Sequence, residues 1–540
     1  MKKIEELKKI LNFYILANKL KTTIIDEDNN YSISDHLFGS ITIAISLNSE
    51  FKETDKISKI IRMMILDEFT RLNPYYNLKS NLKNGEKFQN EIDELHKFKT
   101  KEARLVFKYR MLDFSLTNLI ATQGNKLEYS ELIKEAVKII MPLYSEEYSN
   151  CEEIFKFYYL NSRLKNKVRS GWDNKHWNIK SNRIERISEH IISTIILAMI
   201  MESELGYNNE FDFIRNIDID YIIKMLAIHE LGKTLIGDIT PFDGITPKQK
   251  QEMEHNAIVD AVGRLTNGKE LLEMLFAFDA KIRNEARFAY YCDKIEADLQ
   301  SKFYQDSGLH HTLDDQKNNC VFASEKVHQM IENGAQTAFD IWYLWDKDIY
   351  TKYPEFKEFS DILKLVRDNN IFKLNNFNPT IEKVELNKEE HNFITEKLSK
   401  IIESLYQDNN IDCIYQLNYQ TEEHEKGAIK LVVLLNDGIN CYEYEKLTNK
   451  LSEYCKKMNK TEINIWFDYG YVDDYEIIAL NPSEVYREEI LLSSIILFDK
   501  SGRTTKNKEK INTRGYFYPH NLVEYIPPIE KTLILKLNNK

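Results

Sequence analysis

The chain has 540 residues, of which 43% are hydrophobic and 12% aromatic. A chain of this length exceeds one ordinary core, so we expect several domains. Gly (17) and Pro (10) are scarce, which favours long helices over turn-rich β structure. The net charge of −12 argues against non-specific binding to nucleic acid or to anionic membranes. We therefore predict no membrane partner and no clear nucleic-acid binding.

The N-terminal sequence M-K-K-I-E-E-L-K-K-I-L is charged and amphipathic, and it does not resemble a signal peptide. The longest apolar run, 191–201, is too short to span a bilayer and predicts a buried helix. The cysteines are dispersed without a C-x-x-C pair, which is typical of reduced thiols. Together these features predict a cytoplasmic protein.

Helix-patterned segments of the first part of the chain recur, in the same order, in the second part. The pairs are 13–21 with 157–165, 32–44 with 186–198, 60–69 with 222–231, and 102–113 with 285–296. The offset between partners grows along the chain, so the second copy carries insertions between its helices. This pattern predicts a tandem duplication of a helical domain, with a longer period than solenoid repeats have.

The second copy contains residues of the types that bind metals: His190 in R-I-S-E-H, His229 and Glu230 in A-I-H-E-L-G-K, and Asp293 in Y-C-D-K. Two imidazoles and two carboxylates suit Mn, Fe, Co, Ni or Zn, and such an ion can activate water for hydrolysis. One histidine on an apolar helix is more often a core residue, but four such residues in separate contexts favour a site. We expect all four on helices that the fold brings together, as in helical bundles.

The first copy differs at the corresponding positions. Its residues there are His36 for His190, Asp67 for His229, Glu68 for Glu230 and Arg110 for Asp293. An arginine at a ligand position repels a metal ion, so we expect the first copy not to hold the same metal.

The last part of the chain has a different pattern. An Asn-rich stretch, 368–380, predicts a linker, and a helix-like stretch near 387–406 follows. Strand patterns occupy 412–419, 428–435, 463–469 and 475–480, with a helix pattern over 442–458. The order loosely resembles a minimal nucleotidyltransferase domain, but the G-S motif and the D-x-D pair of such enzymes are missing. The alternatives are a nucleotidyltransferase-like domain without catalytic acids and an unrelated α/β interaction domain.

Several motifs of the second copy resemble those of the HD-domain phosphohydrolases, and within them of the HD-domain 5′-deoxynucleotidases. They are S-R-L-K (162–165), R-S-G-W (169–172), R-I-S-E-H (186–190), H-E (229–230), G-D-I-T-P-F-D-G-I (237–245) and C-D-K-I-E (292–296). The resemblance covers residues from about 150 to 365. It implies a helical fold in which His190, His229, Glu230 and Asp293 hold one divalent ion, a transition metal (Mn, Co, Fe, Ni or Zn) or Mg.

The resemblance also implies hydrolysis of nucleoside 5′-monophosphates. Arg169 would bind the phosphate, because a guanidinium matches phosphate oxygens bidentately. Asp238 would lie near the sugar, at the place where family members favour deoxyribose. Trp172 would shape the sugar or base pocket, or it is a buried structural residue.

Two positions depart from the family pattern. Glu230 replaces the usual aspartate after the second histidine, and Lys233 stands where an acidic residue helps to orient the attacking water. On a helix, Lys233 lies one turn from His229 and faces the same side. We list Lys233 with Asp238 as candidate catalytic residues. Lys233 could bind phosphate, stabilise negative charge in the transition state, or pair with Glu230 or Asp238.

Other histidines are weaker candidates. His255 is either an extra ligand or a solvated helix residue, and the solvated alternative is favoured. His310 and His311 lie in a polar stretch and are expected at the surface. His176, in the insertion of the second copy, could approach the substrate.

We therefore predict a mainly α protein with two tandem HD-type helical domains, the first degenerate, followed by a small α/β or α+β nucleotidyltransferase-like domain. The predicted boundaries are 1–147, 148–367, a linker over 368–385, and 386–540. The predicted function is a metal-dependent phosphohydrolase that releases phosphate from (deoxy)nucleoside 5′-monophosphates, with a small-molecule nucleotide as partner. The alternatives are a hydrolase of nucleoside triphosphates or of cyclic or oligonucleotide signals, and a non-catalytic nucleotide-sensing scaffold. Whether the protein is a homo-oligomer is left open.

Overall fold

The structure is a computed structural model that describes most of the chain up to residue 351 and several segments beyond it. The gaps before 351 are residue 1, 27–28, 74–75, 97–99, 144–147, 182, 207–213 and 215. The described segments beyond 351 are 366–367, 402–416, 429–436, 463–471 and 495–506, with a few positions between 443 and 450. The predicted linker 368–385 and the predicted strand 475–480 lie outside the described residues.

The first half is helical, with one short hairpin. Its helices are α1 (Lys2–Ala17), α2 (Lys19–Thr22), α3 (Ile33–Phe51), α4 (Ile57–Leu72), α5 (Leu78–Asn81), α6 (Gly85–His96), α7 (Lys101–Gln123) and α8 (Tyr129–Ile140). Strands β1 (Ile24–Asp26) and β2 (Tyr31–Ser32) pair between α2 and α3. Helix α3 begins directly after Ser32 because Ser32, as the N-cap, forms a reciprocal capping box with Asp35 that satisfies two free backbone N–H groups.

The second half repeats this arrangement of helices and adds further helices to it. Its helices are α9 (Tyr148–Ser162), α10 (Ile187–Leu205), α12 (Ile219–Ile228), α13 (Lys233–Ile236), α14 (Pro247–Val262), α15 (Gly268–Ala280), α16 (Asn284–Asp306), α17 (Glu325–Glu332) and α18 (Ala338–Thr351). Two 3₁₀ turns, η2 (Arg163–Asn166) and η3 (Ser170–Trp172), lie between α9 and α10. Helices α3, α4 and α7 of the first half therefore correspond to α10, α12 and α16 of the second.

The two halves share one apolar core. The run 191–201 lies on α10 and is almost entirely buried, as predicted, with Ile195, Leu197 and Met201 inaccessible to solvent. Burial of such a side chain stabilises the fold by about 1.5–3 kcal/mol. Buried residues of α1, α3, α10 and α16 belong to the same continuous cluster. The centre of the molecule is therefore common to both halves.

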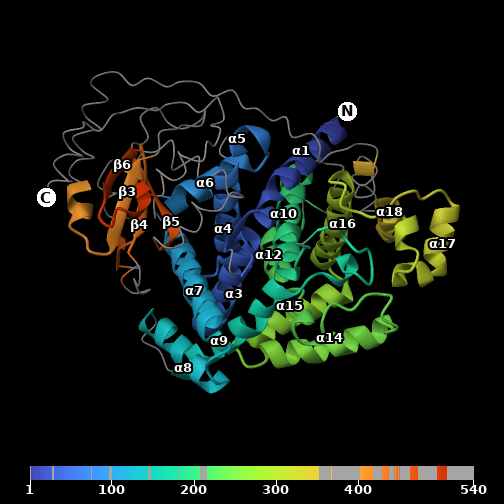
Figure 1. The fold of residues 1–540 in the computed structure, drawn as a ribbon, viewed down its shortest axis with the longest axis horizontal. Coiled ribbons are helices and arrows are strands. Elements are labelled where there is room, and N and C mark those ends of the chain that lie inside the picture. Colours follow the sequence, from blue (N-terminus) through green and yellow to red (C-terminus); the bar gives the residue numbers. More distant parts are fainter. Residues whose placement is uncertain are drawn as a thin grey trace.

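Each half places its first helix on the other half. Helix α1 packs along α10, and α9 packs along α3, while α3 and α10 contact each other directly. Figure 1 shows dark-blue α1 beside green α10. The predicted boundary after residue 147 coincides with the start of α9, but α9 packs against the first half. The helices are thus exchanged between two halves of similar design.

The C-terminal segments form a small mixed sheet. Its strands are β3 (Ile411–Gln416), β4 (Ile429–Leu435), β5 (Ile463–Tyr471) and β6 (Ile495–Asp499), in the order β5-β4-β3-β6. Strand β3 is antiparallel to β4 and β6, whereas β4 and β5 are parallel. Three predicted strands are confirmed, and the sheet fits the predicted α/β or α+β class. The likeness to nucleotidyltransferases stays a prediction.

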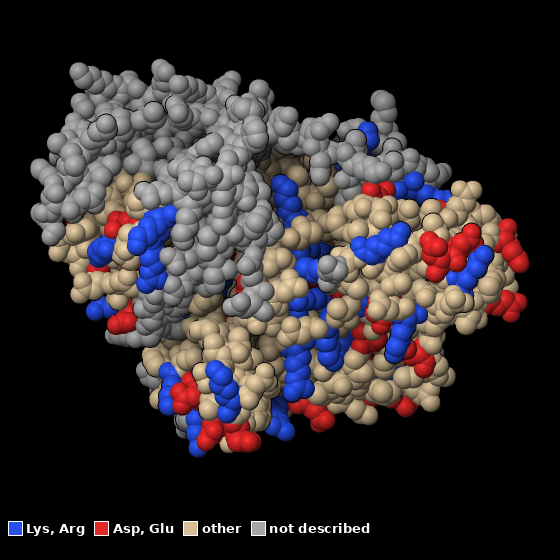
Figure 2. Space-filling model, in the orientation of Figure 1, with Lys and Arg blue, Asp and Glu red and all other residues tan. Residues whose placement is uncertain are grey.

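Surface charge is distributed unevenly. Figure 2 shows Lys and Arg side chains in a band down the middle of one face, although the chain carries a net charge of −12. The net charge therefore does not exclude a local anion-binding surface. In the described part of the chain, no helix is both long and apolar enough to cross a membrane.

Candidate metal centre

Three elements bring the four predicted ligands together. His190 comes from α10, Asp293 from α16, and His229 with Glu230 from the turn after α12; one ligand atom of each lies within 4.8 Å of the others. His190 Nε2 lies 2.8 Å from Asp293 Oδ1 and 3.7 Å from Glu230 Oε1. His229 Nε2 lies 3.8 Å from Asp293 Oδ1. The structure thus brings the whole predicted set to one place.

The prediction that His229 and Glu230 lie on a helix is wrong. Helix α12 ends at Ile228, and the following backbone bonds run from residue i+3 to residue i, as in Leu231 N to Ile228 O and Lys233 N to Glu230 O. Such bonds tighten the chain at a helix end. Glu230 and Lys233 therefore approach each other across a turn, and Lys233 does not stand on a helical face with His229.

Both imidazoles direct Nε2 toward the other ligand atoms of the set. His229 Nδ1 lies 2.7 Å from the Leu226 carbonyl oxygen, which can only accept, so Nδ1 carries the proton. His229 Nε2 is buried and has no hydrogen-bond partner in the described structure. His190 Nδ1 lies 2.5 Å from Glu296 Oε2. Metal-binding histidines are typically held in this way, with the outer nitrogen donating to a carbonyl or carboxylate. The residues present therefore fit a divalent ion.

The carboxyl groups of the centre stay ionised. Burial raises the pKa of Asp293, but Lys294, the hydrogen bond with His190 and the nearby His229 imidazole outweigh it and hold this pKa well below its usual range. Burial likewise raises the pKa of Glu230, and Lys233 and the two histidines bring it below the ordinary value. Metal ligands must be deprotonated, so both groups are in the form that an ion requires.

Lys233 joins the centre to the loop that follows it. Its Nζ lies 2.7 Å from Glu230 Oε1 and 2.7 Å from Asp238 Oδ1. Asp238 also accepts the backbone N–H of Ser170 at 2.8 Å. Burial lowers the pKa of Lys233, yet Asp238 and Glu230 raise it above its usual value, so the ammonium is charged. Of the roles that the sequence left open, the structure has Lys233 paired with both carboxylates.

Arg169 lies beside the same group of acids. Burial lowers its pKa, and the nearby carboxylates of Glu185, Asp238 and Glu230 raise it further than burial lowers it. Its Nη1 is buried without a hydrogen-bond partner among the described residues. An unsatisfied buried donor costs about 1–3 kcal/mol, and more when it is charged. A ligand oxygen that reached Nη1 would remove this cost.

Trp172 is fully buried. Its Nε1 donates to Glu185 Oε2 at 2.8 Å, and its ring lies 4.7 Å from the ring of Trp342. Of the two alternatives, these contacts favour a buried structural residue over a wall of the substrate pocket.

The prediction that His310 lies at the surface is wrong, because only 7% of it is exposed. His310 Nε2 lies 3.1 Å from the Ser301 carbonyl oxygen, and the rings of Trp172, Trp177 and Tyr304 surround it. Two of these rings come from the distant insertion of the second copy. The polar sequence around His310 therefore could not predict that its side chain is buried.

Two other histidines have protein partners. His176 is buried, with Nδ1 at 2.7 Å from Asp173 Oδ1 and Nε2 at 3.0 Å from Thr240 Oγ1, so it ties the insertion to the loop of Asp238. His255 Nε2 lies 2.7 Å from Asp279 Oδ2. His255 does not belong to the ligand groups found among the described residues.

Glu296 was missed as a functional residue. It lies one turn after Asp293 on α16 and binds His190, which fixes the orientation of that ring. The signal was present in C-D-K-I-E, where positions i and i+3 of a helix share a face.

The first half has an ion pair where the second has ligands. Arg110 Nη1 lies 2.7 Å from Asp67 Oδ2, and Arg110 Nη2 donates to the Met64 carbonyl oxygen at 2.9 Å. His96 Nε2 also contacts Asp67, at 2.7 Å. No candidate metal group occurs among the described residues of this half. Asp67 and Arg110 thus satisfy each other, and the absence of metal from the first copy stays a prediction.

Comparison with known proteins places the similarity in the second half. A family model described as an HD domain matches residues 161–333. The 5′-deoxynucleotidase HDDC2 of Dictyostelium discoideum is 32% identical over 161 residues, which are 29% of this chain and 78% of that protein. The human 5′-deoxynucleotidase HDDC2 is 25% identical over 155 residues, 28% of this chain and 69% of the relative. The 5′-deoxynucleotidase hdd1 of Schizosaccharomyces pombe is 25% identical over 150 residues, which are 27% of this chain and 68% of that protein.

Proposed function

The chain belongs to the HD-domain family, in the group of HD-domain 5′-deoxynucleotidases, and we propose on this basis that it is a divalent-metal-dependent phosphohydrolase releasing phosphate from (deoxy)nucleoside 5′-monophosphates. The observation that carries the proposal is the open ligand set of His190, His229, Glu230 and Asp293, with His229 Nε2 buried and unpaired. An imidazole nitrogen that has no protein partner in that position is suited to binding a cation.

His190, His229, Glu230 and Asp293 would hold the ion, which is Mn, Co, Fe, Ni, Zn or Mg. When bound, such an ion supplies Lewis-acid activation of water and neutralises charge on the phosphate ester. The protein contributes the orientation of the ligands. Leu226 O and Glu296 fix the two imidazoles, so that little reorganisation is needed when the ion binds.

Arg169 would bind the phosphate of the substrate. Its free Nη1 has a buried position beside the ligand carboxylates, and a guanidinium is the side chain best suited to phosphate oxygens. Lys233 would place a second positive charge at the same site. Together the two cations would stabilise the charge that develops as the ester bond to the nucleoside breaks.

Asp238 would set the preference for the sugar. It is held by Lys233 Nζ and by the backbone N–H of Ser170, so its carboxylate cannot turn away from the site easily. A fixed acceptor beside the sugar discriminates between ribose and deoxyribose through the 2′ position.

A non-catalytic nucleotide sensor is the second candidate, and one observation favours it. The Lys233 ammonium is paired with Glu230, a ligand carboxylate, and therefore competes with a cation for the same oxygen. Hydrolysis of triphosphates or of cyclic or oligonucleotide signals by the same site is the third, since one fold supports several reactions.

The test is phosphate release from a panel of ribo- and deoxynucleoside monophosphates, triphosphates and cyclic nucleotides, with added Mn, Co or Mg. We expect release from deoxynucleoside monophosphates by the native protein and none above background by His229→Ala. Nucleotide binding without release, by a protein that carries metal, would replace the hydrolase with the sensor.

A further inference from the structure

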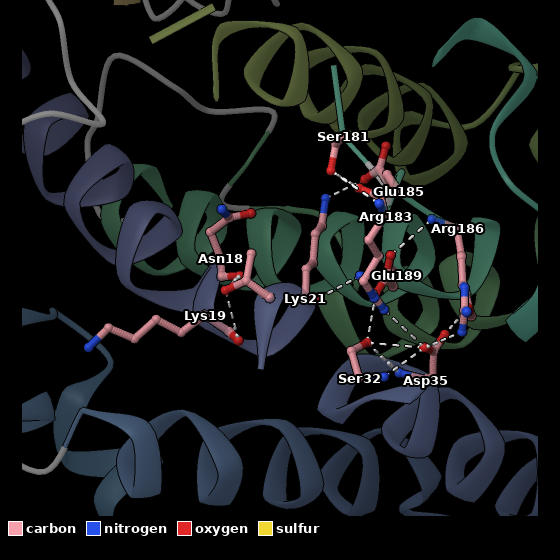
Figure 3. A network of polar contacts seen from close by, with 12 residues as sticks. Asn18, Lys19, Lys21, Ser32, Asp35, Ser181, Arg183, Glu185, Arg186 and Glu189 are labelled. Carbon is pink, nitrogen blue, oxygen red and sulfur yellow. Dashed lines mark hydrogen bonds and ion pairs between the residues drawn. The ribbon is translucent and has the colours of Figure 1, made fainter. Parts of the chain in front are cut away.

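A polar network joins the two halves next to the metal centre. Figure 3 shows Lys21, from the end of α2, beside Glu185 of the second half, with Ser32 and Asp35 facing Arg186 and Glu189. Lys21 forms an ion pair with Glu185 and a second one, at 2.5 Å, with Glu296. The first half therefore reaches into the layer of residues that surrounds the metal ligands.

Two residues of the first half hold Glu296. The Tyr14 hydroxyl donates to Glu296 Oε1 at 2.8 Å, and Lys21 Nζ binds the same oxygen. The other oxygen of Glu296 receives His190 Nδ1. A chain of contacts thus runs from Tyr14 and Lys21 through Glu296 to His190 and ends at the ligand set.

The network is buried and charged. Lys21 is 4% exposed and Glu296 is inaccessible to solvent. Burial lowers the pKa of Lys21, but Glu185 and Glu296 raise it above its usual value. Burial raises the pKa of Glu296, and Lys21 and His190 together hold it far below the ordinary range. Removal of one partner from such a pair leaves a buried charge without compensation.

An equivalent chain of contacts runs from the second half into the first. Lys165 of the second half binds Asp113 Oδ1 at 2.8 Å, and the Tyr158 hydroxyl donates to the same oxygen at 2.6 Å. Asp113 Oδ2 in turn contacts His36 Nδ1 at 2.9 Å. Tyr158 and Lys165 occupy the positions of Tyr14 and Lys21 in the repeat, and Asp113 that of Glu296. Each half therefore supplies a tyrosine and a lysine to the other.

The N-terminal turns of α3 and α10 keep the halves in register. Ser32 Oγ donates to Glu189 Oε1 at 2.7 Å, and Ser188 Oγ donates to Asp35 Oδ1 at 2.5 Å. Arg186 lies 3.1 Å from Asp35. These reciprocal contacts fix α3 against α10, so the exchanged helices arrive at defined positions.

We propose that Lys21 and Tyr14 of the first half are positioning residues for the metal centre of the second half, acting on His190 through Glu296. The first half, in whose described residues no candidate ligand group occurs, thereby completes the site of its neighbour. The inference rests on the proposed metal-dependent function. It assigns a role to a region that the family similarity does not cover, because the HD-domain match begins at residue 161.

The test compares Lys21→Met with Lys165→Met in the full-length chain. The two changes remove buried lysines at matching positions of the repeat: Lys21 pairs with Glu185 and Glu296 beside the metal centre, and Lys165 pairs with Asp113 of the other half. Mn²⁺ affinity is measured by calorimetry after chelator treatment, together with kcat and KM for a deoxynucleoside monophosphate. Tyr14→Phe, which removes one hydroxyl, is the milder variant and carries the test if Lys21→Met does not fold.

We expect Lys21→Met to weaken Mn²⁺ binding about 10–100-fold, the usual effect of losing an outer partner of a ligand, and to lower kcat more than it raises KM. Tyr14→Phe should change both in the same direction by less. Lys165→Met should lose thermal stability but keep its Mn²⁺ affinity. Equal Mn²⁺ affinity in the native protein and in Lys21→Met or Tyr14→Phe overturns this inference alone. A native protein that binds no divalent ion overturns the proposed function and this inference with it.

Discussion

The two halves of the molecule place the same helices around two very different polar centres. In the first, Arg110 is paired with Asp67 and fills the space with an internal ion pair. In the second, Asp293 and His229 take these positions, and His229 Nε2 is left without a partner in the described structure. The helices correspond in the two halves, but Asp67 lies within α4, whereas His229 lies in the turn after α12. We infer that the residues at these two positions, together with this turn, decide whether the centre is filled by an internal ion pair or offers ligands to an ion.

The halves also differ in what surrounds the centre. Only the second has the insertion 169–178, which carries Arg169, and the loop of Asp238 that hydrogen-bonds to it. The helical frame with its ligand side chains would therefore form the metal centre, and the insertion and the loop of Asp238 would provide the groups that select a phosphate substrate.

Replacing the residues of the second centre by those of the first is expected to have the largest effect on metal binding and activity. The double change His229→Asp with Asp293→Arg copies the first half into the second. We expect loss of the divalent ion and at least a 10³-fold fall in phosphate release, with the fold preserved because the new residues can pair as Asp67 and Arg110 do. Metal analysis, activity and circular dichroism check this. Retained activity would mean that these two positions do not distinguish the halves.

The converse exchange tests the same comparison from the other side. Asp67→His with Arg110→Asp gives the first half the ligand types of the second, next to His36, which already has its outer carboxylate in Asp113. We expect a second divalent ion per chain, with a Kd at least 100-fold below that of the native first half. Titration calorimetry measures it, and Asp67→His alone serves as the control.

Arg169→Lys tests the role of the insertion. We expect kcat/KM to fall about 100-fold, since lysine keeps the charge but loses bidentate binding of phosphate. The metal content should not change, because Arg169 is not a ligand. Steady-state kinetics and metal analysis of the same sample separate the two. A parallel loss of metal would assign Arg169 to the centre instead of to the substrate.

Lys233→Gln tests whether the ammonium competes with the ion. The change frees Glu230 Oε1 from its partner. We expect the affinity for Mn²⁺ to rise about 10-fold, because a like charge near the ion is removed, while kcat falls by a similar factor. Unchanged affinity would show that Lys233 moves aside at no cost when metal binds.

The smallest expected effect concerns His310, which lies among the rings of Trp172, Trp177 and Tyr304 in the second half. Burial lowers the pKa of His310 to about 4. The group is neutral when folded and gains a proton on unfolding below the ordinary pKa of histidine, about 6.5. The stability that neutral His310 contributes is therefore fully present above that pH and is lost as the pH falls toward 4.

Relative to His310→Asn, the native protein should lose about 2 kcal/mol of stability between pH 7 and pH 5. Denaturant unfolding at both pH values measures the difference. A pH-independent difference between the two proteins would contradict the burial of a neutral imidazole.

The sequence revealed the ligand set because each of its members lies in or beside a strongly patterned helix. It did not reveal the turn at His229, since i+3 bonding there depends on how α12 ends in the fold. His310 was misplaced because the rings that bury it come from distant segments.

The pairing of Lys21 with Glu296 was equally hidden. Both positions lie within the repeated segments 13–21 and 285–296, but the exchange of α1 and α9 between the halves is a property of tertiary packing, which local sequence patterns do not predict. The same limit applies to Lys233, whose two partners are set by the turn and by the loop of Asp238.

The most direct test of the account is the number of divalent ions bound per chain, measured by elemental analysis of the native protein and of His229→Ala. The account predicts about one ion in the native protein and none in the variant, because the first half is closed by the Arg110–Asp67 pair. No ion in the native protein, two ions, or one ion that survives His229→Ala would contradict it.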